Sequence, residues 1–401
     1  MSHSLIRRII DYLVLTLPFI LITLKNVGNL WLLVLVIIGG YLFLFEKNRI
    51  GLSFELKLFS WISVVYFLIF ALSNYLNGAA SFEDYSDLFK KLHFLLVPLL
   101  AIAITQGQIS LKQVLVSGFI GILFGLTYQY YQSFHLNMNR SSGLFNTNIY
   151  GDMLALYSIF AFVFMINHHK FYERFISFAL FLTGAYGVVL TGSRGSILAL
   201  LALVIITLFI QYKSFRKQPL LVIFMVLSVV VLVTLLDPSI QKRFDLAYQQ
   251  IELWLSGEKL TTSVGYRLEY IRSGFLAFMH SPWFGLGMFD PQVLLSEYSR
   301  IKSPHSHLHN EITGHLLSAG LMGIVGYFAI LYAPFHIFKK NLQIKENRLA
   351  GLIGLNLVIG FFLFGLTHVT FQQEVINSVW MFYSVYLIAQ IKHQDASNSN
   401  S

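Results

Sequence analysis

The chain has no cysteine among its 401 residues, and it has few charged residues for its length. Without a thiol it can form neither a disulfide nor a thiolate nucleophile, which excludes a disulfide scaffold and cysteine catalysis. Charged residues make up 12% of the chain, whereas average soluble domains carry about 25%. The chain is 56% hydrophobic with a mean hydropathy of +0.66. Over this length, such values indicate many membrane spans rather than a soluble core.

Apolar runs, each about long enough to cross the hydrocarbon core of a bilayer, recur along the whole chain. The twelve runs are residues 9–24, 30–45, 56–73, 92–105, 114–131, 149–166, 175–190, 196–210, 220–236, 313–335, 349–367 and 375–391. We therefore predict an all-α, polytopic membrane protein with about twelve transmembrane helices and one large helical periplasmic loop. Its parts are transmembrane helices 1–9 over residues 1–236, the loop over 237–312, and helices 10–12 with a cytoplasmic tail over 313–401.

Basic residues between the apolar runs predict the orientation, because cytoplasmic loops of membrane proteins are enriched in Lys and Arg. With the N-terminus inside, sixteen basic residues are cytoplasmic: Arg7, Arg8, Lys47, Arg49, Lys57, Lys112, Lys170, Arg174, Lys213, Arg216, Lys217, Lys339, Lys340, Lys345, Arg348 and Lys392. Five lie in short outer loops: Lys25, Lys90, Lys91, Arg140 and Arg194. The seven in residues 237–312 carry little weight, because long loops are translocated largely regardless of charge. The count predicts that both termini are cytoplasmic.

The same distribution accounts for the net charge of +9 without a nucleic-acid partner, because the basic residues lie in short loops between apolar runs. Membrane lipids are the expected surroundings instead. Arg7 and Arg8 lead into the first run and no small-residue cleavage site follows, so we expect an uncleaved first span.

Residues 237–312 have the pattern of a structured loop. Apolar residues recur there at three- and four-residue steps, at Ile240, Phe244, Tyr248, Ile251 and Leu255. This spacing predicts an amphipathic helix. A second helix is expected from about 264 to 280, ending at Ser281-Pro282. A structured loop of this length usually has a function.

Among the arginines on the predicted outer side, three are the main site candidates: Arg140, Arg194 and Arg267. Arg194 lies in the short turn 191–196 between two apolar runs, near the membrane edge. A snorkelling or topology role is the alternative there, but ionisable groups at membrane depth are seldom without function. Arg140 opens a turn-like segment and Arg267 begins the second loop helix, where a solvated turn or helix face is the alternative. Guanidinium groups suit phosphate oxygens, so the set predicts a site for a phosphate-bearing substrate.

Three histidines at two-residue spacing, His305, His307 and His309, precede the tenth apolar run. An extended strand would place them on one face, as in a zinc site. No Asp, Glu or Cys at a familiar spacing completes such a centre, so we predict no metal and no other cofactor. One histidine acting as a general base fits better, because free histidine titrates near ambient pH. A polar interfacial loop is the alternative.

At these residues the chain resembles the O-antigen ligase family, a broad group that also holds O-antigen polymerases and some protein O-oligosaccharyltransferases. The resemblance covers about residues 140–325. Its four elements are the Arg140–Asn148 segment, the Ser-Arg-Gly turn at Arg194, Arg267 followed by Pro282-x-x-Gly-x-Gly, and His309-Asn310 followed by Gly320-x-x-Gly.

The resemblance implies an inner-membrane glycosyltransferase that acts on the periplasmic face. Its donor would be a polyprenyl-diphosphate-linked glycan and its acceptor lipid A–core. Arg194 and Arg267 would hold the donor diphosphate with help from Arg140, and His309 would be the general base, with His307 as its rival. The candidate substrate-binding residues also include Asn148, Asn310 and Arg272. The transfer would need no metal and would invert the anomeric centre.

Two other functions stay open. A polymerase of the same family would use the same donor but extend a second polyprenyl-linked chain, which requires two anionic subsites. Three arginines suffice for one diphosphate, and this favours the ligase. A transporter or flippase for a lipid-linked glycan would need polar residues at mid-membrane and on both sides, whereas the apolar runs here are nearly free of charge.

The orientation can be tested with reporter fusions at three loop positions. Because the charge count places residues 237–312 outside, fusions at Lys213, Ser256 and Lys345 should report cytoplasm, periplasm and cytoplasm, respectively. A cytoplasmic signal at Ser256 would contradict the orientation and every role assigned to the outer arginines.

Overall fold

The computed structural model describes residues 3–46, 51–81, 83–168, 170–212, 223, 225–228, 230, 238–289, 291–302 and 308–391. Within these ranges every regular element is helical, which confirms the all-α prediction. The elements of the first half are α1 (His3–Thr23), α2 (Val27–Phe45), α3 (Phe54–Leu76), η2 (Glu83–Tyr85), α4 (Ser86–Phe89), α5 (Leu92–Ile104), α6 (Leu111–Tyr130), the π-helical turn η3 (Tyr131–His135), α7 (Thr147–Asn167) and α8 (Phe171–Thr191). Those of the second half are α9 (Arg194–Ile210), α12 (Pro238–Ser256), α13 (Ser263–His280), α14 (Pro291–Leu294), α15 (Glu311–Asn341), α16 (Arg348–Gly365) and α17 (Glu374–Ala389).

The described helices follow the predicted apolar runs. Each run overlaps a described helix except 220–236, most of which lies outside the described residues. By length and composition, seven described helices can cross a membrane: α2, α3, α6 with η3, α7, α8, α15 and α16. The apolar helices α9 and α17 are shorter, with 17 and 16 residues. The chain is therefore a multi-pass membrane protein, and the count of about twelve spans stays a prediction.

The bundle is built around α7. Of its most apolar 18-residue window, 94% is buried, and the helix packs against α8, α9 and α16. A membrane helix that is apolar all round and covered all round is an interior element rather than a lipid-facing one. The start of α7 is therefore fixed from several sides, which matters because this turn contributes to the candidate site.

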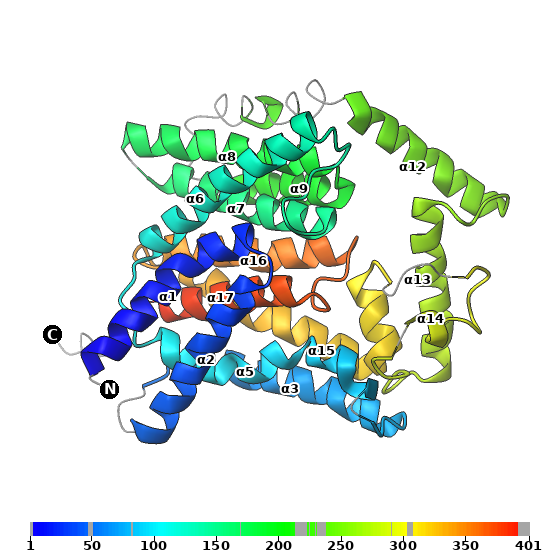
Figure 1. Ribbon diagram of the computed structural model, residues 1–401, viewed down its shortest axis with the longest axis horizontal. Helices are drawn as coiled ribbons and strands as arrows, with labels where there is room; N and C mark the ends of the chain where they lie inside the picture. The colour runs from blue at the N-terminus through cyan, green and yellow to red at the C-terminus, as the bar shows by residue number, and fades with distance from the viewer. Residues whose placement is uncertain are drawn as a thin grey trace.

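One end of the bundle carries the two predicted loop helices, α12 and α13, which lie across the ends of the long helices (Figure 1). Loops predicted to be periplasmic meet at this α13 end. The Ser73 hydroxyl, near the end of α3, donates to the carbonyl of Phe284 beyond α13 at 2.6 Å. The Asn310 amide, before α15, donates to the carbonyl of Leu366 beyond α16 at 3.0 Å.

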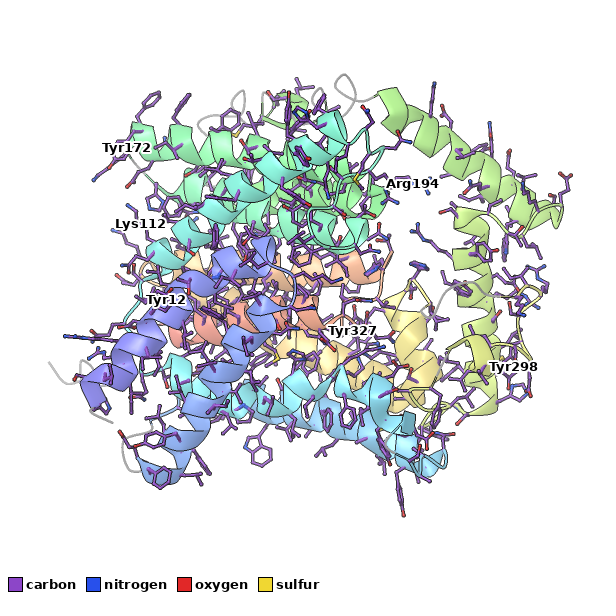
Figure 2. All side chains as sticks on the ribbon, viewed as in Figure 1. Tyr12, Lys112, Tyr172, Arg194, Tyr298 and Tyr327 are labelled. Atoms are coloured by element: carbon purple, nitrogen blue, oxygen red, sulfur yellow. The ribbon has the colours of Figure 1, made fainter. Side chains whose placement is uncertain are left out.

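The opposite end gathers loops predicted to be cytoplasmic. Lys112 in the first turn of α6 pairs with Glu173 near the start of α8 at 2.8 Å, and Arg348 at the start of α16 donates to the side chain of Gln211 beyond α9 at 2.9 Å. Figure 2 shows Lys112 at this end and Arg194 at the other. The loops thus sort by end as the predicted alternation requires. The side of the membrane that each end faces rests on the charge count.

A buried polar network lies just inside the α13 end. The carboxylate of Glu311, the first residue of α15, accepts from the backbone N–H groups of Thr370 at 2.5 Å and Phe371 at 3.3 Å. The ammonium of Lys91 donates to the carbonyl of Phe371 at 3.2 Å and to the hydroxyl of Tyr66 at 2.8 Å. Both charged side chains are fully buried. The two side chains hold the loop 366–373 from two sides, and their charges have opposite signs.

Lys91 and Lys90 form a matched pair for testing this network, because Lys90 is a neighbouring lysine whose side chain is 45% exposed. Lys91→Met should destabilise the protein by about 3–5 kcal/mol, because it leaves the Glu311 carboxylate buried without its opposing charge. Lys90→Met should have little effect, as is usual for surface pairs. Unfolding of the purified protein in detergent measures both, and equal stabilities would contradict a structural role for Lys91.

Candidate functional site

A cavity of about 370 Å³ lies at the α13 end, between the bundle and the loop helices. Its described lining is Arg140, Asn148, Asp152, Gly192, Ser193, Arg194, Gly195, Leu246, Gln250, Ser263, Arg267, Thr367 and His368. We call it the arginine cavity. It brings together four predicted site residues, Arg140, Asn148, Arg194 and Arg267, from separate parts of the chain.

Three helices contribute to the lining through residues spaced by four. The pairs are Asn148 and Asp152 on α7, Leu246 and Gln250 on α12, and Ser263 and Arg267 on α13. Side chains four apart lie on one helix face. Each helix therefore presents one face to the cavity, and the amide oxygen of Gln250 joins two of them by accepting from the N–H of Val264 at 3.1 Å.

The turn between α8 and α9 places Arg194 in the cavity wall. Gly192 ends α8 in the left-handed conformation at φ 60°, and Ser193 precedes the first residue of α9, which is Arg194. Glycine adopts this conformation without a steric penalty, so the chain reverses within two residues. Arg194 is half-buried and faces the loop helices at the bundle end, as Figure 2 shows.

Gly195 is required by the neighbouring loop. A Cβ atom at this position would lie 2.2 Å from Oγ1 of Thr367 and 2.9 Å from its Cβ. Real side chains do not approach so closely, so any larger residue would push the loop 366–373 away from the arginine turn. The Ser-Arg-Gly sequence thus has a packing reason as well as a chemical one.

Arg140 is anchored to the same turn. Its Nε donates to the carbonyl of Thr191 at 2.9 Å and its Nη2 to Oδ1 of Asn148 at 3.2 Å. The adjoining Ser141 adds a backbone hydrogen bond from its N–H to the carbonyl of Leu190 at 3.1 Å. Asn148 therefore orients an arginine of the cavity, and the segment before α7 is docked on the end of α8.

Arg267 lies in the second turn of α13 and faces Arg194. Burial lowers the pKa of the Arg267 guanidinium, and the positive charge of Arg194 lowers it further. Both effects disfavour the positive charge of Arg267. An anion bound between the two arginines would relieve the repulsion and replace lost solvation.

Two imidazoles meet beside the arginines. His368 is 4% exposed and lines the cavity. The ring of His309 stands edge-on to it, with centroids 6.1 Å apart, and stacks at 6.4 Å on Tyr270. His309 has a positive φ of 54°, a conformation that is uncommon outside glycine. The rival base His307, like His305, lies outside the described residues.

Asn310 and Arg272 occupy structural positions outside the described lining of the arginine cavity. Oδ1 of Asn310 accepts from the N–H of Thr313 at 2.9 Å and so caps α15. Arg272 pairs with Glu269 at 3.0 Å and donates to the carbonyl of Tyr298 at 3.3 Å. The structure thus gives each of them a role in holding the loop, and neither lies in the described lining of the cavity, although Asn310 directly follows His309.

A buried acid holds the two loop helices against the segment 291–302. Glu269 on α13 is fully buried and pairs with Nη2 of Arg300 at 2.6 Å. Burial favours the neutral acid, but hydrogen bonds and charge from Arg300 outweigh it and lower the pKa of Glu269. The Arg300 guanidinium also lies over the ring of Trp254 on α12, 5.4 Å from its centroid. This cluster fixes the wall formed by α12 and α13.

Asp152 and His368 are the cavity residues that the sequence interpretation missed. For Asp152 a signal existed, because it is an acid inside an apolar run, one helical turn after Asn148. For His368 there was none nearby in the sequence. Its position depends on a loop that is held by residues far away in the chain.

The comparisons with known proteins concern the sequence of this part of the chain. Residues 178–328 match the family described as O-antigen ligase, a segment that contains Arg194, Arg267 and His309. The predicted resemblance is therefore confirmed. The chain is also similar to an uncharacterized protein of Haemophilus influenzae, with 24% identity over 330 residues that cover 78% of this chain and 80% of that protein.

Proposed function

Because residues 178–328 form a segment of the O-antigen ligase family, we propose that this protein is an O-antigen ligase of the bacterial inner membrane. It transfers a polyprenyl-diphosphate-linked O-antigen glycan to lipid A–core on the periplasmic face. The observation that carries the proposal is the convergence of Arg140, Arg194 and Arg267 on one cavity at the α13 end.

Arg194 and Arg267 hold the donor diphosphate, and Arg140 assists. The fork of a guanidinium can bind two phosphate oxygens at once. As the bond between the sugar and the diphosphate breaks, negative charge grows on the leaving group. Arginines already held in place stabilise this charge without reorganising, so they act more strongly on the transition state than on the bound donor.

His309 is the general base. It takes the proton from an acceptor hydroxyl while the hydroxyl oxygen attacks the anomeric carbon from the face opposite the diphosphate. One C–O bond forms, the bond to the leaving phosphate oxygen breaks, and the anomeric configuration inverts. His368 lines the cavity, and the centroid of its ring lies 6.1 Å from that of His309.

The ligase is favoured over a polymerase by the number of anionic subsites. A polymerase must hold two lipid-diphosphate chains, whereas a ligase holds one and a lipid-anchored core sugar. The three arginines converge on a single cavity in the described residues. The α12 and α13 walls supply Leu246, Gln250 and Ser263 on the side where an acceptor would enter.

Arg267→Ala and Arg194→Ala should each lower glycan transfer at least a hundredfold while the protein still accumulates in the membrane. The reason is the loss of charge stabilisation in the transition state, which for one preorganised donor is worth roughly 10²–10³ in rate. Lysine should restore only part of the rate, because an ammonium cannot bind two oxygens in a planar fork.

Arg272→Ala is the matched control, since Arg272 lies on the same helix but binds Glu269. It should keep most of the transfer activity. In vitro transfer from a purified donor measures all the variants, and full activity in either cavity variant would remove that arginine from the site.

His309→Ala should lower transfer by roughly 10²–10⁴-fold, as expected for loss of a general base, and His307→Ala should lower it less. His368→Ala, measured alongside, reports whether the second imidazole also contributes. We expect transfer to survive a chelator. Loss of activity in EDTA that zinc or magnesium restores would overturn the assignment of a metal-independent base.

The lipopolysaccharide banding pattern of a deletion strain separates the ligase from the polymerase. Without a ligase, long glycan chains should accumulate on the polyprenyl carrier and lipid A–core should be bare. Without a polymerase, lipid A–core should carry a single repeat unit. A band with a single repeat unit would contradict the ligase proposal. The arginine cavity would then still be the proposed donor site, but of a polymerase.

A further inference from the structure

Asp152 is an unexplained acid in a cavity otherwise dominated by arginines. It lies in the second turn of α7, is 3% exposed and lines the arginine cavity. Its Oδ1 accepts from the hydroxyl of Ser196 at 2.6 Å. Its Oδ2 is buried and has no hydrogen-bond partner among the described residues.

A buried carboxylate oxygen without a partner is costly, and native proteins rarely keep one without a reason. Ser196 does not meet the need, because its hydroxyl donates to Oδ1 and not to Oδ2. Within the described ranges Asp152 forms no ion pair with the cavity arginines. A group on the bound substrate is therefore the natural partner for Oδ2.

The chemistry of that group follows from its surroundings. A carboxylate repels phosphate oxygens, so Asp152 cannot serve the diphosphate itself. It can accept from a hydroxyl or an amide N–H. In a cavity of about 370 Å³ that holds a diphosphate on its arginines, the nearest such groups belong to the sugar bonded directly to that diphosphate.

We propose that Asp152 is a specificity-determining residue, whose Oδ2 accepts a hydrogen bond from a hydroxyl or acetamido N–H on the first sugar of the donor. This assignment rests on the proposed function. It adds that the site recognises the sugar next to the diphosphate, whereas the arginines hold any polyprenyl diphosphate alike. Ser196 donates to Oδ1, so Oδ2 is the oxygen that is left for the sugar.

The test compares the binding of two ligands to the purified full-length protein. One is polyprenyl diphosphate without a sugar, and the other is the same lipid carrying a single N-acetylated sugar. The wild-type protein should prefer the second. Asp152→Ala should reduce that preference by about tenfold to a hundredfold, the usual range for a hydrogen bond to a charged group, and Asp152→Asn should reduce it less. Binding of the sugar-free lipid should be unchanged or tighter, and this also confirms that each variant is folded.

Ser196→Ala is the matched control, because it removes the partner of Oδ1 and leaves Oδ2 in place. It should keep the preference within about threefold, well below the range for a lost hydrogen bond to a charge. If Asp152→Ala weakens both ligands equally, or Ser196→Ala removes the preference as fully, Asp152 supports the arginine turn and the sugar assignment is wrong. If the wild-type protein binds neither ligand, or Arg267→Ala binds both normally, the proposed function fails and the assignment fails with it.

Discussion

The geometry of the α13 end depends on the buried carboxylate of Glu311. It holds the backbone N–H groups of Thr370 and Phe371, and so it fixes the loop that carries His368 into the cavity wall. Glu311 is also the first residue of α15, so its contacts also hold the point at which the chain enters this helix after His309. A single buried charge would cost too much free energy of desolvation. The opposite charge of Lys91, which donates to the carbonyl of Phe371, lies nearby and reduces this cost. Glu311 thus ties the loop that carries His368 to the start of α15, two residues after His309.

The arginines impose the opposite constraint, since Arg267 shares a cavity with Arg194, and both burial and the charge of Arg194 disfavour the charge of Arg267. Two flexible arginine side chains would move apart into solvent, so the surrounding backbone must hold them close together. The reversal at Gly192, the close contact of Gly195 with Thr367, and the hydrogen bond from Arg140 to Thr191 fix one wall. The cluster of Glu269, Arg300 and Trp254 fixes the opposite wall, which α12 and α13 form. Under the proposed function, this arrangement would be preorganised for the anionic donor.

The sequence predicted what depends on local pattern. The apolar runs, the two loop helices and the short turn at Arg194 follow from periodicity and spacing, and the structure contains them. It did not predict what depends on packing between distant segments. Arg272 has a charge suited to a phosphate, but buried Glu269 binds it, and Asn310 is used as a helix cap. His368 reaches the cavity only because Glu311 holds its loop. The assigned roles of the site residues await the measurements described above.

The arginines and Asp152 have charges of opposite sign, and together they determine the formal charge of the cavity. Three arginines and Asp152, if ionised, give a formal charge of 3 − 1 = +2. A diphosphate that links a lipid to a sugar carries two negative charges, so under the proposed function the donor would balance the charge of the cavity without excess attraction. When the bond between sugar and diphosphate breaks, the leaving diphosphate gains a third negative charge, and the arginines would interact with it more strongly than with the donor. This is the differential binding that accelerates a reaction. With a neutral residue in place of Asp152, the cavity would attract every diphosphate more strongly, including a lipid diphosphate without a sugar.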